Sequence, residues 1–141
     1  MSRWFSGFAS SLGLRPARPL AVAAGASEFI GGGLLALGLA TPLAAVLIVS
    51  TMVVAARTAH AGKGVWVSEG GWELPLVYGA VAVGFAFSGA GPWSLDAAVG
   101  WDVSGLPWGI GALALGILGG ASVLTLGRER RSAGRSAPVG A

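Results

Sequence analysis

Four long apolar runs, separated by short polar connections, dominate the pattern of this chain. As a helix, each run approaches or reaches the roughly 30 Å thickness of a bilayer's hydrocarbon layer. We therefore expect an all-α bundle of four transmembrane helices, at 20–39, 42–59, 72–89 and 108–126. Only Ala40 and Thr41 separate the first two runs, which predicts a tight antiparallel hairpin, and Pro42 suits the first turn of its second helix.

The two ends of the chain have different patterns. Trp4, Phe5, Phe8 and Leu12 share one helical face, which predicts a short interfacial helix within 1–18. Gly127 closes the last apolar run, and the small polar and basic residues that follow predict a disordered tail at 128–141. The expected organisation is one membrane domain, 1–127, followed by this tail.

Composition supports a membrane protein and excludes several chemistries. The chain is 54% hydrophobic and only 11% charged, with a mean hydropathy of +0.74, whereas soluble domains carry about 25% charged residues. It contains no cysteine, which excludes disulfides, thiolate metal sites and iron–sulfur clusters within the chain. A single histidine cannot supply two axial ligands to a haem, and we expect no metal site.

The charge distribution predicts the orientation. The loop at 88–107 carries Asp96 and Asp102 but no Lys or Arg. On the predicted topology every basic residue falls on the other side, which should be the cytoplasm, as should the tail. These residues are Arg3, Arg15, Arg18, Arg57, Lys63, Arg128, Arg130, Arg131 and Arg135. Their places at span ends and in the tail argue against nucleic-acid binding, despite the net charge of +3.

Glu28 is the one ionisable residue of the first run. A charge near mid-membrane costs at least about 2.5–3.5 kcal/mol, so such a residue is usually paired, protonated or functional. It shares a helical face with Gly25, Gly32 and Ala36, and small residues let helices approach closely. We therefore expect Glu28 to face another helix. Ala112, Gly116 and Gly120 form a similar face on the last run.

The hairpin should bring Glu28 towards a group of polar residues at the cytoplasmic end. Arg57 and His60 are i, i+3 neighbours at the end of the second run, and Glu73 begins the third. The candidate site is therefore a polar cluster of Glu28, Arg57, His60 and Glu73, in which Arg57 reaches inward and Glu73 meets His60. Such a cluster could bind a quinone head group near Glu28 and His60 and relay its protons.

A structural interpretation of the same residues stays open. Arg57, or the hydroxyls of Thr51 and Thr58, could hold Glu28 and fix the helix register without any chemistry. Arg57 and Lys63 could serve only to set topology, and His60 could be a solvated loop residue. We expect Asp96, together with Ser94, to cap or tie a turn and not to act in catalysis.

Several segments together resemble the DoxX family. They are FASSLGLRPARPLAVAAGASEFIGGGLLALGLATPLAA, then His60, Gly64-Val65-Trp66, GGWELPL at 70–76 and GAGPWSLDAAVG at 89–100, so the resemblance covers roughly 5–100. Members usually begin with a further membrane helix, which this sequence does not show, and the fourth run is an extension beyond the family's usual end. The resemblance implies a small integral membrane protein with redox associations: a quinone-linked thiosulfate oxidoreductase subunit in some organisms, a membrane anchor for oxidative-stress enzymes in others.

From these features we expect an accessory or quinone-interacting subunit of a membrane redox system, and not an independent enzyme. Two alternatives stay open: a non-catalytic anchor that recruits a soluble oxidoreductase, and a small proton-coupled transporter that uses Glu28. The expected partners are the lipid bilayer and a membrane or soluble redox protein, and a homo-oligomer is compatible with the sequence.

Overall fold

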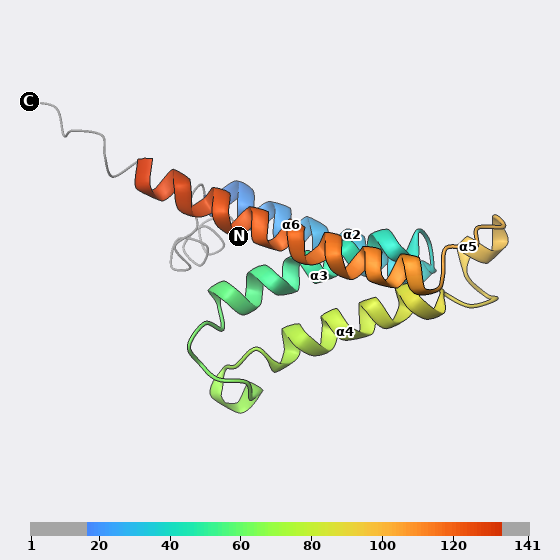
Figure 1. Cartoon of the computed structure of the whole chain (residues 1–141), viewed down its shortest axis with the longest axis horizontal. Coiled ribbons are helices and arrows are strands. Elements are labelled where there is room, and N and C mark those ends of the chain that lie inside the picture. Colours follow the sequence, from blue (N-terminus) through green and yellow to red (C-terminus); the bar gives the residue numbers. More distant parts are fainter. Residues whose placement is uncertain (1–16, 134–141) are drawn as a thin grey trace, which may run out of the picture.

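The computed structural model describes residues 17–133, with side chains for 22–126, and this part of the chain is all-helical (Figure 1). Its helices are α2 (Ala17–Leu37), α3 (Thr41–Thr58), α4 (Glu73–Ser88), α5 (Leu95–Ala98) and α6 (Leu106–Ala133), with a 3-10 turn, η1 (Val67–Glu69). The predicted all-α class is confirmed. The predicted interfacial helix at 1–18 lies almost entirely outside the described residues. The end of the predicted tail, 134–141, also lies outside them.

The long helices follow the four apolar runs, with one difference at the C-terminal end. α6 continues through Gly127 to Ala133, so residues 128–133, predicted as disordered, are helical. Arg and Glu are good helix formers, and no proline lies between Gly127 and Ala133 to stop the helix. Two segments are long and apolar enough to span a membrane, Thr41–Thr58 and Leu106–Leu126, whereas Val22–Leu37 and Glu73–Ser88 are shorter. The full set of four spans stays a prediction.

α3 is the central helix of the bundle. It packs against α2, α4 and α6, and α4 also contacts α6 (Figure 1). The turn between α2 and α3 lies beside α5 at one end, which we call the α5 end. The opposite end, where α3 leads through the loop 59–72 into α4, we call the His60 end.

Small residues fill the interior of this bundle, and large apolar residues cover its outside. The buried core consists of Ala44, Ala45, Val49, Ala82, Ala86 and Ala112. Exposed side chains include Phe29, Leu43, Tyr78, Val81, Ile110, Leu115 and Leu118, each at least half exposed. A soluble protein would bury such groups, whereas helices in lipid bury small residues where they meet. The distribution is therefore that of a membrane protein.

The glycines of α6 bring its backbone against α3. A Cβ on Gly116 would lie 2.6 Å from Val49 Cβ, and one on Gly120 would lie 2.7 Å from Val53 Cβ. At this contact the Ser50 hydroxyl donates a hydrogen bond to the Gly116 carbonyl, at 3.0 Å. The predicted packing face of Ala112, Gly116 and Gly120 is confirmed.

The predicted packing face of α2 is wrong. α2 meets α3 through Gly31, where a Cβ would lie 3.1 Å from Ile48 Cγ1, whereas no part of the described chain lies within 4 Å of a Cβ on Gly25 or Gly32. At 100° per residue, the face centred near Gly32 lies about 100° around the helix from this contact. Glu28 is exposed on that open side.

Candidate functional site

The loop at the His60 end is held together by its own backbone. The amides of Gly71 and Glu73 donate to the carbonyls of Trp66 and Val65, at 2.8 and 2.9 Å. Gly71 lies so close to the Val65 carbonyl that no larger residue fits there. The chain therefore returns to α4 along one defined path, with little of the freedom of an open loop.

His60 is tied into this loop by one of its ring nitrogens. Its Nδ1 lies 2.6 Å from the carbonyl oxygen of Gly70. A carbonyl can only accept, so Nδ1 carries the proton and donates. In the neutral ring, Nε2 is then the acceptor. The loop thus selects the tautomer of His60.

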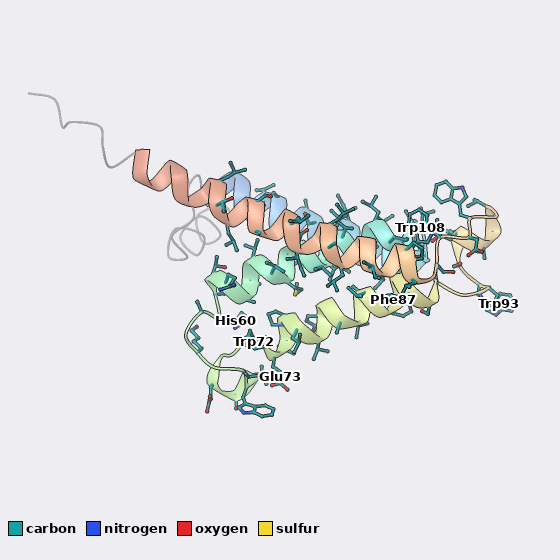
Figure 2. All side chains as sticks on the ribbon, viewed as in Figure 1. His60, Trp72, Glu73, Phe87, Trp93 and Trp108 are labelled. Atoms are coloured by element: carbon teal, nitrogen blue, oxygen red, sulfur yellow. The ribbon has the colours of Figure 1, made fainter. Side chains whose placement is uncertain are left out.

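A cavity of about 440 Å³, which we call the His60 cavity, opens between the end of α3 and the start of α4. Its polar and aromatic lining comes from Arg57, His60 and Trp72, and the rest is Ala56, Ala61, Gly62 and Gly64. Figure 2 shows His60 and Trp72 close together between the end of α3 and the start of α4. The cavity therefore combines a guanidinium donor, an imidazole and an indole surface.

Glu73 has a different role from the one expected. Its Oε2 accepts a hydrogen bond from the Val67 amide, at 2.8 Å, which caps the first turn of η1. Glu73 does not line the His60 cavity. Its carboxylate therefore stabilises the loop that positions His60, and the predicted meeting of Glu73 with His60 is replaced by this cap.

Glu28 is not brought to Arg57 and His60. The Gly31–Ile48 contact places Glu28 roughly level with Thr51, about 9 Å along the helix axis from Arg57. The hydroxyls of Thr51 and Thr58, considered above as its partners, donate instead to the Leu47 and Val54 carbonyls of their own helix. The predicted cluster is thus separated in space, and a functional role for Glu28 stays a prediction.

Asp96 is the most completely bonded carboxylate of the described chain. It is 3% exposed, and its Oδ1 accepts from the Ala40 amide at 2.7 Å. Its Oδ2 accepts from both the amide and the hydroxyl of Thr41, at 3.1 and 2.8 Å. Its own amide donates to the Gly38 carbonyl, at 2.9 Å. These four bonds, which we call the Asp96 clip, fasten the loop before α6 to the α2–α3 turn.

Through this clip Asp96 acts as the N-cap acceptor of α3, although it lies far from that helix in the sequence. Ala40 precedes α3 and has no side-chain acceptor, so Asp96 satisfies the first amides of that helix. Ala40 adopts a left-handed φ of 47°, and Gly38 has no room for a Cβ against Ser94. Burial favours the neutral carboxyl, but the hydrogen bonds from Thr41 and Ala40 outweigh it and lower the pKa of Asp96.

The expectation that Asp96 and Ser94 tie a turn is confirmed. The Ser94 hydroxyl accepts from the Ala97 amide, at 3.1 Å, as the N-cap of α5. The longer connection of Asp96 to Ala40 and Thr41 was not expected, because the sequence gives no sign of which segments face each other across the end of the bundle.

The helices, their small-residue core and their apolar exterior define a helical membrane protein. A family model described as DoxX matches residues 2–61. The resemblance to the DoxX family is thereby confirmed over the part of the chain that carries Glu28, Arg57 and His60. The later landmarks, at 64–66, 70–76 and 89–100, lie beyond the match. No curated protein and no solved structure matches the chain.

Proposed function

We propose that this protein is an accessory subunit of a membrane redox system that binds a quinone head group in the His60 cavity. The observation that supports this is the combination of Arg57, His60 and Trp72 around one cavity of about 440 Å³. Its volume suits a small ligand. The cavity also lies at the end of apolar helices, where the head group of a lipid-soluble molecule meets water.

The chemistry of the lining suits both redox forms of a quinone. Arg57 can donate N–H groups to a quinone carbonyl. His60, with Nδ1 committed to Gly70, can accept a quinol hydroxyl proton at Nε2. Trp72 offers an aromatic surface against which a flat ring can stack. Glu28 lies outside this proposed site because it is exposed on α2, no residue of which lines the His60 cavity.

The test is equilibrium binding of a water-soluble benzoquinone to the full chain in detergent micelles. We expect saturable binding that His60→Ala weakens about tenfold, the effect of losing one hydrogen bond of about 1.4 kcal/mol. Arg57→Gln should weaken binding to a similar extent. Glu69→Gln is the matched control, because Glu69 is exposed on the same loop but does not line the cavity.

Two results would contradict this assignment: unchanged binding in both cavity variants, or an equal loss in Glu69→Gln.

A chain that binds no quinone would instead favour the anchor function. The observation in favour of an anchor is the exposed tip of the same loop, where Val65, Trp66 and Val67 are 42%, 63% and 49% exposed. On that alternative the loop tip recruits a soluble oxidoreductase.

We also propose that the His60 end faces the cytoplasm. Within the described chain this end holds Arg57 and Lys63, and the Asp96 clip shows that the α2–α3 turn and the loop without basic residues share the other end. Positive residues are retained on the cytoplasmic side. Of two reporters fused after Ala141, the one that is active in the cytoplasm should therefore work, and the one that is active only after export should not. Activity of the exported reporter would contradict the proposed orientation.

A further inference from the structure

A second cavity lies at the α5 end, opposite the His60 cavity. The loop 89–105 surrounds it, and its volume is about 400 Å³, within the range of small-ligand sites. The side chains that matter for its chemistry are Ser94, Asp96, Trp101, Asp102 and Ser104. We call it the α5 cavity. Neither the quinone site nor the family match involves it.

The walls of the α5 cavity are fixed by hydrogen bonds. The Asp96 clip ties one side to the α2–α3 turn, and the Trp101 amide donates to the Asp96 carbonyl at 2.8 Å. On the other side the Gly105 amide donates to the Phe87 carbonyl, also at 2.8 Å. Phe87 itself packs directly on Gly109 at the start of α6. A cavity held in this way is formed before a ligand arrives.

The charge of the lining excludes anions. Residues 88–107 contain two carboxylates and no Lys or Arg. The oxygens of Asp96 are committed to α3, so Asp102 provides the accessible negative charge, with its Oδ1 accepting from the Ser104 hydroxyl at 3.0 Å. Within the described residues, no three His, Cys, Asp or Glu side chains gather to hold a metal ion.

Trp101 adds the feature that distinguishes an organic cation from a metal ion. Trp101 lines the same cavity as its neighbour Asp102. An indole face attracts alkylammonium groups, whose charge is spread over C–H bonds, and a carboxylate beside it balances the charge. We propose that the α5 cavity binds an organic ammonium group between Trp101 and Asp102, supplied by a free amine or by a lipid head group of the adjacent leaflet.

The test is equilibrium dialysis of radiolabelled choline against the full chain in a non-ionic detergent at constant ionic strength. We expect saturable binding that Trp101→Leu and Asp102→Asn each weaken about 3- to 30-fold, as expected for a cation–π contact or a partly exposed ion pair. The matched control is Trp93→Leu, because Trp93 lies on the same loop, is fully exposed and does not line the cavity (Figure 2).

The same measurement in nanodiscs distinguishes the two sources. Weaker choline binding in phosphatidylcholine than in an uncharged galactolipid without an ammonium group means that lipid head groups occupy the site, and equal binding means that it takes a free amine. The proposal is overturned if binding does not saturate or if both cavity variants bind like the unchanged protein. An equal loss in Trp93→Leu would overturn it as well. The quinone assay is independent of all these outcomes.

Discussion

Replacing Asp96 by alanine is expected to lower the free energy of unfolding by about 3 kcal/mol or more. The carboxylate accepts three hydrogen bonds from Ala40 and Thr41 in a buried position, and hydrogen bonds to charged groups contribute about 1.5–3 kcal/mol each. The substitution leaves the first amides of α3 and the Thr41 hydroxyl without an acceptor. Reversible unfolding by SDS in mixed micelles measures the change.

The pH dependence of stability should identify the charge of Asp96 as the cause. Its pKa in the folded chain lies below the ordinary value of 3.8, so the folded state favours the ionised form. The stabilisation is therefore complete above about pH 5 and is lost as the pH falls through 3.8 towards the folded pKa. Asp96→Asn should remove this part of the acid sensitivity, because asparagine does not titrate.

The control for this substitution is Asp102→Ala in the same loop. Asp102 is exposed, and its Oδ1 accepts a hydrogen bond from the hydroxyl of Ser104, two residues away. We expect a change within about 0.5 kcal/mol, as at other surface positions. Similar losses of stability in the Asp96 and Asp102 variants, or a small loss in the Asp96 variant, would show that the Asp96 clip does not hold the loop before α6 to the α2–α3 turn.

Helix positions could be predicted from the sequence because they depend on local pattern. The apolar runs place α2, α3 and α4 within a few residues of their observed bounds. The end of α6 was misplaced because a glycine alone is a weak stop signal when good helix formers follow. By length and hydropathy, α3 and α6 can each span a membrane, whereas the apolar parts of α2 and α4 are shorter than a full span.

Helix rotation could be predicted for α6 but not for α2. The small residues of α6 repeat on a single stripe, and this stripe meets α3. In α2, Gly31, Gly32 and Gly33 are consecutive, so they point in three directions about 100° apart and any of them could mark the contact. The spacing of Glu28 from Gly25 and Gly32 favoured one direction, whereas packing against Ile48 uses another.

The candidate site was predicted only in part because its contacts link distant segments. Arg57 and His60, expected together as i, i+3 neighbours, line one cavity, but Trp72 joins them and Glu73 caps η1 instead. The bond from His60 to Gly70 and the Asp96 clip each depend on how a loop folds back, which no helical period encodes. Asp96, which lies in the segment GPWSLD that resembles the DoxX family, is therefore a structural residue of the loop before α6.

Adding one methyl group to Gly120 is expected to destabilise the bundle, whereas the same change at Gly111 should not. A Cβ on Gly120 would lie 2.8 Å from the Ser50 carbonyl oxygen and 2.7 Å from Val53 Cβ, so α3 and α6 would have to separate. Such overpacking costs about 1–3 kcal/mol. Gly111 lies in the same helix, and among the described residues nothing lies within 4 Å of its Cβ position, so alanine there gains up to about 1 kcal/mol of helix propensity.

The two alanine variants therefore isolate packing from propensity, because both replace a glycine inside α6 by the same residue. Unfolding by SDS should place Gly120→Ala below the unchanged protein and Gly111→Ala at or above it. If both variants gain stability, the α3–α6 contact is looser than its glycines require. If both lose stability equally, Gly111 is itself packed in the membrane, and a second copy or a partner subunit must cover that face of α6.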